Sequence, residues 1–543
     1  MIKLKALSLC AASATVLSLI SVQANALSLD EDHYPLKLLG KFIFFDEISA
    51  PERQSCASCH APDTGGTNDN AYINRTVVAV PGANVHVSGM LKPPTNAYAS
   101  EIEPFHECNQ GGISFGGSGG PTSGDRYCGG NFWDGRAEGR EATLFNATRH
   151  IGMEIFQGEP DSRGYSNYFG ATSDQALNPM PNPVEQNIQR QAVCEHVATS
   201  EYAEIYEVVW GEPIDCSDNP VDYMANDLPP EERPEREFDI SFKRLMLAVG
   251  AWQSSDEVNS FSSKRDIALR TELACDDGEF SEYYDPGVCA DEEYINSPGS
   301  FPLVGLSYQE NLGHDLFYNT DPPGPATAPF PDLPVTQCSF CHLSDQASRD
   351  GTGLFERYAD DAYHNIGTPA NPDVPGADDP DNLPTGLAGH VDPTSDGGFF
   401  KTPTLRNVDK RPNQRFIKAY THNGWFKSLE SLVHFYNTSD VDGETAAAFG
   451  ITRCPPEITS ERRALRSNCW PEPEWPGAAF GFLVGDLGMD AAQEAALVAY
   501  IKALTDSMTA QPPQLNELYA LTGSSEPAVE EEPAAPRRLT RSR

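Results

Sequence analysis

The sequence is short of basic residues. Lysine and arginine together number 38 against 79 aspartate and glutamate residues, which gives a formal net charge of −41 at pH 7. Such a negative field repels the phosphates of nucleic acids and anionic lipid headgroups, so nucleic-acid binding is excluded. The same field can steer a basic redox protein toward the molecule, although a solvated acidic coat also serves solubility alone.

Long apolar runs are absent after the first 26 residues. Crossing a bilayer takes roughly 20 consecutive apolar residues, so no membrane span is expected in the rest of the chain. The start of the chain combines Lys3 and Lys5, an apolar run over 6–22 and a small-residue end at 24–26. This is the pattern of a secretory signal (1–26). We expect an exported protein, periplasmic or at the cell surface.

Cysteine use fits an oxidising compartment. Of 13 cysteines, Cys10 lies within the signal and four belong to two Cys-X-X-Cys-His motifs, which leaves eight. An even number outside the cytosol most simply forms disulfides. Their grouping along the chain predicts that neighbours pair, as Cys108–Cys128, Cys194–Cys216, Cys275–Cys289 and Cys454–Cys469.

The strongest local signal is the repeated Cys-X-X-Cys-His motif. It occurs as Cys56, Cys59 and His60 and again as Cys338, Cys341 and His342. Two thiols at this spacing reach the two vinyl groups of one porphyrin, and the adjacent imidazole falls over its iron. Zinc sites and thioredoxin-like dithiols also use Cys-X-X-Cys, but neither accounts for the histidine after both pairs. The sequence therefore predicts two covalently bound haem c groups.

The pattern along the chain predicts a mainly α fold with long loops. Apolar spacing indicates helices over 238–251 and 490–504, the second with Asp490 and Gln493 as a capping pair, while strand-like alternation is scarce. Residues rich in Pro and Glu near the C-terminus have little to bury. We expect two haem domains, over 27–265 and 305–508. An insert over 266–304 separates them, and a disordered tail follows over 509–543.

Six further motifs resemble, in order, those of the bacterial dihaem cytochrome c peroxidase family, including its MauG branch, across most of 36–508. They are LGKFIFFDEIS (39–49), NFWDGRA (131–137), NPVEQ (182–186), YHNIGTP (363–369), FKTPTLRN (400–407) and THNGWFKSLESLVHFYN (421–437). The resemblance implies two cytochrome c-like domains. It places the peroxide site at the N-terminal haem and the entry of electrons at the C-terminal haem, with His60 and His342 as proximal ligands.

The resemblance also assigns catalytic roles. Trp133 of the FWDGR motif corresponds to a tryptophan between the haems that relays electrons; without the family it reads as a core aromatic beside an Asp134–Arg136 ion pair. Glu185 corresponds to the distal acid that moves protons during peroxide cleavage. On residue type alone, Glu185 is a helix N-terminal glutamate after Pro183.

The sixth ligand of the second iron distinguishes the branches. Peroxidases of the family carry Met seven residues after the Leu that corresponds to Leu429, whereas the MauG branch has Tyr there, and here the residue is Tyr436. We expect a His342/Tyr436 pair; the alternative is a tyrosine packed on the haem edge. His434 competes, but two residues along a helix it points almost oppositely. His86 lies in the loop that supplies a displaceable histidine to the first iron, or is an exposed loop histidine.

Some positions depart from the family pattern. The distal Gln is Thr143 here, and an insertion near 145–177 lengthens the segment between Trp133 and Glu185. Interdomain calcium is implied by the resemblance, yet its Asn position is Lys92, which can itself supply positive charge. The Thr and Pro of that calcium site are Ile417 and Ala419.

These observations favour an exported dihaem enzyme that uses hydrogen peroxide and oxidises a partner protein in the manner of the MauG branch. Two rival functions stay open at this point. One is an ordinary peroxidase that takes electrons from a small redox protein, and the other is a dihaem electron carrier without turnover. The sequence does not define the oligomeric state.

Overall fold

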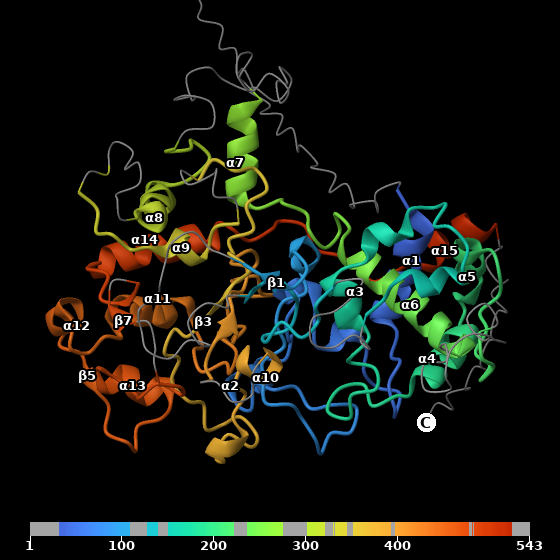
Figure 1. Cartoon of the computed structure of the whole chain (residues 1–543). Coiled ribbons are helices and arrows are strands. Elements are labelled where there is room, and N and C mark those ends of the chain that lie inside the picture. The colour runs from blue at the N-terminus through green and yellow to red at the C-terminus, as the bar shows by residue number, and fades with distance from the viewer. Residues whose placement is uncertain are drawn as a thin grey trace, which may run out of the picture.

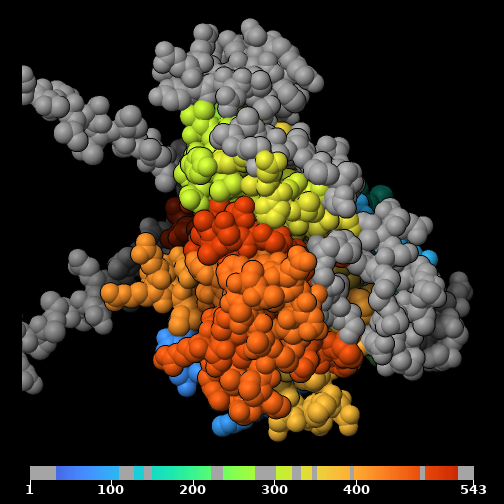
Figure 2. Space-filling model, turned by 90° about the vertical axis from the view of Figure 1, so that its left-hand side faces the viewer, coloured from blue at the N-terminus to red at the C-terminus, as the bar shows by residue number. Residues whose placement is uncertain are grey.

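The protein is mainly helical, as the sequence predicts. The structure is a computed structural model that describes residues 32–108, 127–139, 150–221, 236–274, 301–320, 330, 332–344, 351–391, 397–476, 480–481 and 483–523. Two helical units lie side by side (Figure 1), and each contains one Cys-X-X-Cys-His motif. In the space-filling view, the C-terminal unit forms an orange and red face below the yellow-green segment that contains α7 and α8 (Figure 2).

The N-terminal unit is built on one long buried helix. It contains α1 (Tyr34–Phe45), α2 (Ala71–Arg75), α3 (Ala171–Ala176), α4 (Arg190–Ala198), α5 (Ala203–Trp210) and α6 (Glu237–Gln253). Helix α1 crosses α6 at close range, because a Cβ added to Gly40 would meet the Ala248 carbonyl oxygen at 1.8 Å. Around this crossing the apolar core of the unit forms, with Leu39, Ile43 and Trp252 fully buried.

The C-terminal unit repeats this helix crossing. It contains α8 (Tyr308–Tyr318), α9 (Cys338–Cys341), α10 (Ala388–Val391), α11 (Leu429–Thr438), α12 (Glu444–Phe449), α13 (Glu461–Ser467) and α14 (Ala491–Lys502). A Cβ on Gly313 of α8 would meet the Ala496 carbonyl oxygen of α14 at 2.0 Å. The expected Asp490–Gln493 capping box begins α14. Both units therefore bury their first helix against their last by the same device.

Extended structure is confined to two-residue strands in the described chain. They pair as β1 (His106–Glu107) with β2 (Tyr127–Cys128), β3 (Tyr363–His364) with β4 (Phe400–Lys401), β5 (Thr452–Arg453) with β6 (Cys469–Trp470), and β7 (Phe480–Gly481) with β8 (Val484–Gly485). The first two pairs are antiparallel and the last two parallel. Short 3-10 helices serve as connectors, at Cys56–Ser58, Pro62–Thr64, Ala99–Glu101, Met153–Phe156, Tyr165–Tyr168 and Pro380–Asn382.

Three of the expected disulfides are confirmed. Cys108–Cys128, Cys194–Cys216 and Cys454–Cys469 are bonded. The expected Cys275–Cys289 pair lies outside the described residues, as does the signal segment 1–26. In the part of the chain that the structure describes, no helix combines the length and apolar character that a bilayer crossing requires.

The prediction of a disordered tail over 509–543 is wrong for its first part. Residues Leu515–Thr522 form α15, which returns to the N-terminal unit beside α1 and α5 (Figure 1). Leu518 is 3% exposed in the core, and Glu517 lies 3.5 Å from the buried ammonium of Lys41. The proline-rich composition of this segment gave no sign of a helix. The short amphipathic helix α15 is stabilised by its packing on the N-terminal unit.

A buried ion pair joins α7 to the C-terminal unit. Arg406, from the FKTPTLRN motif, donates to both oxygens of Asp266 at 2.7 and 2.9 Å, and neither side chain is exposed. Asp266 belongs to α7 (Lys264–Leu273), which follows directly after the N-terminal unit. The bidentate geometry lowers the pKa of Asp266 to about 2 against the opposing effect of its burial. The pair fixes the start of α7, the helix that follows the N-terminal unit, against the C-terminal unit.

Candidate active site

Each Cys-X-X-Cys-His motif borders its own cavity. The first cavity, about 280 Å³, is lined by Cys56, Cys59 and His60, and the second, about 180 Å³, by Cys338, Cys341 and His342. Most other side chains on the two walls are apolar or belong to the matched motifs. The structure thus brings together the three residues of each motif at a cavity.

Both histidines are held in the orientation that metal binding needs. In the first motif, Ser55 and Ser58 cap a 3-10 turn, and Nδ1 of His60 donates to the Gly66 carbonyl at 3.1 Å. In the second motif, Nδ1 of His342 donates to the Tyr358 carbonyl at 3.0 Å. A proton placed on Nδ1 leaves the lone pair on Nε2, and a carbonyl partner also raises the basicity of the ring.

The cysteines of both motifs suit thioether attachment to a porphyrin edge. Burial raises the pKa of the Cys56 and Cys59 thiols to about 12, and that of Cys338 to about 11. Zinc sites also use Cys-X-X-Cys, and zinc itself deprotonates the thiols that it binds. A porphyrin edge, by contrast, matches an apolar wall carrying two thiols and a histidine. The residues present therefore fit haem in both cavities.

Trp133 borders both cavities. Its indole is 6% exposed, and its Nε1 donates to the Lys92 carbonyl at 2.8 Å. Its own carbonyl accepts from the Lys401 backbone N–H at 3.0 Å, so the residue is tied to both units. The local ion pair expected beside it is also present, with Arg136 Nη1 2.7 Å from Asp134 Oδ2. The reading as a core aromatic beside an ion pair is therefore confirmed, and the electron-relay role stays a prediction.

Glu185 lies on the wall of the first cavity. Burial raises the pKa of its carboxyl above the usual 4.5, while the charge of Arg136 and a hydrogen bond from Asn182 oppose that rise. Its Oε2 atom is buried and has no hydrogen-bond partner among the described residues. A carboxyl group in this state can bind a small polar ligand and exchange a proton with it.

Tyr436 and His434 separate as the helical spacing predicts. Tyr436 lines the second cavity, and burial raises the pKa of its phenol. His434, two residues earlier on α11, instead turns to Glu494, with 2.9 Å between Nδ1 and Oε1. Of these two side chains, Tyr436 is the one that lines the cavity of His342.

Another sequence-predicted position, that of His86, does not line the first cavity. His86 is exposed, and the cavity wall in its loop is formed by Val80, Gly89 and Met90 instead. Its use as an iron ligand would need the loop to move. Thr143 lies outside the described residues. Of the insertion expected near 145–177, the described part packs on α6, with Ile151 and Ile155 buried in the core.

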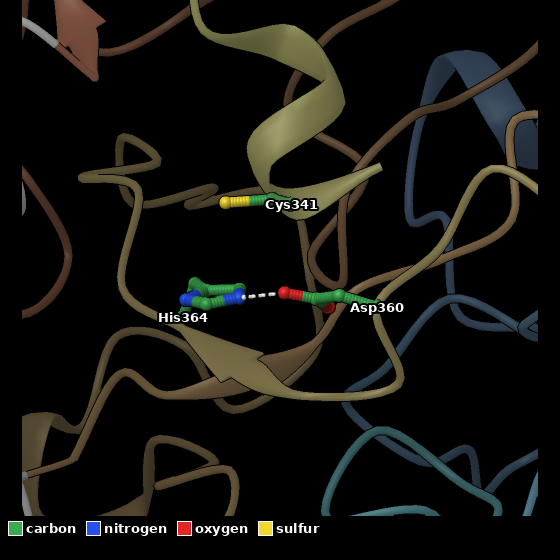
Figure 3. Close-up of side chains that lie close together, drawn as sticks. All are labelled: Cys341, Asp360 and His364. Atoms are coloured by element: carbon green, nitrogen blue, oxygen red, sulfur yellow. Dashed lines mark hydrogen bonds and ion pairs between the residues drawn. The ribbon is translucent and has the colours of Figure 1, made fainter. Parts of the chain in front are cut away.

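Sequence reasoning missed two buried pairs beside the second cavity. His422 Nε2 lies 2.6 Å from Glu474 Oε2, with side chains 6% and 4% exposed, and the His422 ring is 6.4 Å from Trp133. Its partner comes from a segment that the sequence motifs do not include. The second pair is His364 and Asp360, 2.8 Å apart, beneath the Cys341 sulfur (Figure 3). Since Cys341 belongs to the haem motif, this group does not form a separate metal site.

The chain is similar to known di-haem proteins. Residues 36–273 match the family described as di-haem cytochrome c peroxidase. The methylamine utilization protein MauG of Paracoccus denitrificans is 26% identical over 480 residues, which cover 87% of this chain and 88% of that protein. Among solved structures, the diheme peroxidase BthA of Burkholderia thailandensis gives a TM-score of 0.52 at 22% identity, with 88% of this chain and 87% of that chain covered.

A tyrosine-to-methionine variant of BthA aligns equally well, with a TM-score of 0.52 at 21% identity. At this identity the two structures establish the fold alone. The family match, the relative over most of the chain and the paired cavities agree with the motifs read from the sequence. Residues 36–273 match the di-haem cytochrome c peroxidase family and most of the chain is similar to MauG, which implies two haem cofactors and a peroxidase-type oxidoreductase.

Proposed function

We propose that this chain is an exported enzyme that reduces hydrogen peroxide in the first cavity and draws electrons from the second. Haem c would be held covalently in each cavity by its motif, Cys56, Cys59 and His60 in one and Cys338, Cys341 and His342 in the other. When bound, haem supplies the iron that binds peroxide and the redox couple that exchanges electrons. The observation that carries the proposal is that Trp133 borders both cavities.

Glu185 is the group that moves protons in the first cavity. Peroxide cleavage requires one group to take the proton from the inner oxygen and to deliver it to the departing oxygen. The unpartnered Oε2 of Glu185 and the raised pKa of its carboxyl suit both steps. Arg136 keeps the carboxylate accessible by lowering that pKa in part.

Trp133 carries charge between the cavities while its indole keeps its proton. The Nε1–H is committed to the Lys92 carbonyl, which is no base, so loss of an electron leaves positive charge on the ring. The buried His422–Glu474 pair next to it offers a carboxylate that stabilises such charge. The Lys92 carbonyl accepts from the indole, and the Lys401 N–H donates to the backbone carbonyl of Trp133, so both units hold this residue.

Tyr436 and His342, which line the same cavity, would together hold the iron of the second haem. A phenolate oxygen is a hard anionic donor that favours higher oxidation states of iron, and it would allow an oxidising equivalent to be shared between the cavities. This arrangement suits oxidation of a partner protein. If Tyr436 instead packs on the haem edge, the enzyme is an ordinary peroxidase that takes electrons from a small redox protein.

The net charge of the enzyme indicates its protein partner, and its disulfides indicate its cellular compartment. A net charge of −41 favours a basic protein partner, as donor or as substrate. Disulfides such as Cys194–Cys216 persist in oxidising compartments, which supports export to the periplasm or the cell surface.

The deciding experiment is a resting-state electron paramagnetic resonance spectrum of the purified holoprotein, repeated after addition of peroxide. We expect two distinct ferric haem signals, one of which has the signature of histidine and oxygen ligands, and loss of both signals after peroxide. A spectrum that peroxide leaves unchanged would favour the electron-carrier alternative. Absence of a Soret band would remove the haem assignment altogether.

A further inference from the structure

We infer that the ammonium group of Lys418 is a positioning cation that ties the loop behind His60 to the C-terminal unit. The inference rests on the proposed iron-binding role of His60. Lys418 is 4% exposed and lies in the C-terminal unit, just before the THNG motif.

Its three hydrogen bonds reach across the boundary between the units. Nζ of Lys418 donates to the carbonyl oxygen of Thr64 at 2.8 Å, and Thr64 belongs to the loop after the first haem motif. The other two acceptors are the carbonyl oxygens of Asn407 at 3.3 Å and Lys410 at 3.0 Å, both in the C-terminal unit. One side chain thus joins three backbone segments.

The three carbonyl acceptors around Nζ of Lys418 require the charged form of this amine. Burial, and after it the charge of Lys92, lowers the pKa of Lys418 well below the usual 10.5, so the charged form has to be argued from the hydrogen bonds. A neutral amine has two N–H groups and a lone pair, and the lone pair would face a carbonyl oxygen. Only the ammonium offers three N–H donors to three carbonyls, and their dipoles replace the water lost on burial. Lys418 therefore acts as a cation fixed by the chain itself.

Hydrogen bonds within the loop couple the position of Thr64 to that of His60. The Thr64 hydroxyl donates to the carbonyls of Ala61 and Thr67, which bridge each other across the loop, so Thr64 cannot move alone. Two residues on, the Gly66 carbonyl accepts the Nδ1–H of His60. Gly65 packs so tightly that a Cβ there would lie 2.6 Å from the Asn407 carbonyl oxygen. The C-terminal unit thereby sets the hydrogen bond that orients the first histidine.

The surroundings do not fit calcium, the cation that the family resemblance implies between the units. Calcium takes six to eight oxygen ligands. Here Lys92 brings a second buried ammonium, bonded to the Pro93 carbonyl at 3.0 Å. The Ile417 carbonyl is already occupied by the Asn74 amide at 3.0 Å. The two lysines supply the positive charge in its place.

The test compares K418M with K427M in the holoprotein. Lys427 also joins the units through carbonyls, those of Asn74 and Gly424, but it does not contact the His60 loop. We expect K418M to lower the Fe–His stretching frequency of the first haem in resonance Raman spectra of the reduced protein. The reduction potential of the first haem should rise in K418M, because a weaker hydrogen bond at Nδ1 makes His60 a poorer electron donor to the iron. K427M should leave both values unchanged, and the second haem should not respond to either variant.

Three outcomes would overturn the inference. In the first, K418M melts at a lower temperature but keeps both first-haem values of the wild type, which makes Lys418 merely structural. In the second, K427M shifts them equally. In the third, the wild type contains calcium whose removal by chelation causes the same shift. If K418M is not recovered, K418Q, which keeps two N–H donors without the charge, is measured in its place. A protein without a Soret band would instead refute the proposed haem attachment.

Discussion

The Nε1 of Trp133 donates to the carbonyl oxygen of Lys92 at 2.8 Å, while the backbone N–H of Lys92 donates to the His422 carbonyl, also at 2.8 Å. The tryptophan between the two cavities is therefore linked through Lys92 to the C-terminal unit. This arrangement has consequences for catalysis, for spectroscopy and for stability.

Glu185→Gln should keep both haem spectra and lose peroxide turnover. The amide has nearly the same shape but cannot take the proton, and loss of a general acid–base group costs typically about 10²–10⁴-fold in rate. Steady-state peroxide consumption measures the effect. Glu195→Gln, at an exposed site on α4, is the matched control and should be silent. Wild-type turnover by E185Q would remove this residue from the mechanism.

The reaction with peroxide should slow as pH falls through the pKa of Glu185. Only the carboxylate can accept the first proton, and burial raises this pKa above the usual 4.5, so the loss begins at a higher pH than for an exposed glutamate. Stopped-flow rates measured over a pH series give the inflection. In E185Q the inflection should disappear, and an inflection that persisted would belong to another group.

Tyr436→Met should change the spectrum and potential of the second haem alone. A thioether stabilises the reduced iron better than an oxygen donor, so the potential should rise. His434→Gln is the control on the same helix, because His434 faces Glu494 instead of the cavity. Unchanged absorption and potential in Y436M would show that Tyr436 is not a ligand.

Leu518→Ala should destabilise the N-terminal unit by about 2 to 4 kcal/mol, the usual cost of deleting a buried leucine side chain. Leu518 is 3% exposed against the core, whereas Leu515 on the same helix is 43% exposed. Thermal or denaturant unfolding of L518A and L515A measures the difference. Equal stability of the two variants would mean that α15 does not dock in solution.

The sequence predicted those features that are set by local spacing. Cys-X-X-Cys-His places three groups at one cavity, the alternation of Tyr436 and His434 follows from helix geometry, and neighbouring cysteines such as Cys454 and Cys469 pair because little chain separates them. Capping by Asp490 could likewise be read directly.

Contacts between distant segments could not be predicted in this way. Glu474 pairs with His422 from a segment without a recognisable motif. The role inferred for Lys418 depends on carbonyl groups of segments that are distant in the sequence. Leu518 is one apolar side chain in a polar tail, and its burial depends on a surface formed by α1 and α5. In each case the tertiary partner outweighs local composition.

The most direct test of the proposed relay mixes peroxide with Trp133→Phe and follows both haems by stopped-flow absorption. Trp475→Phe is the matched control, since Trp475 also lines the second cavity and donates its Nε1–H to a carbonyl, that of Pro384, but does not border the first cavity. We expect W475F to behave as wild type, whereas in W133F the first haem responds and the second follows much more slowly. Equal rates at the second haem in W133F and in wild type would contradict the relay through Trp133.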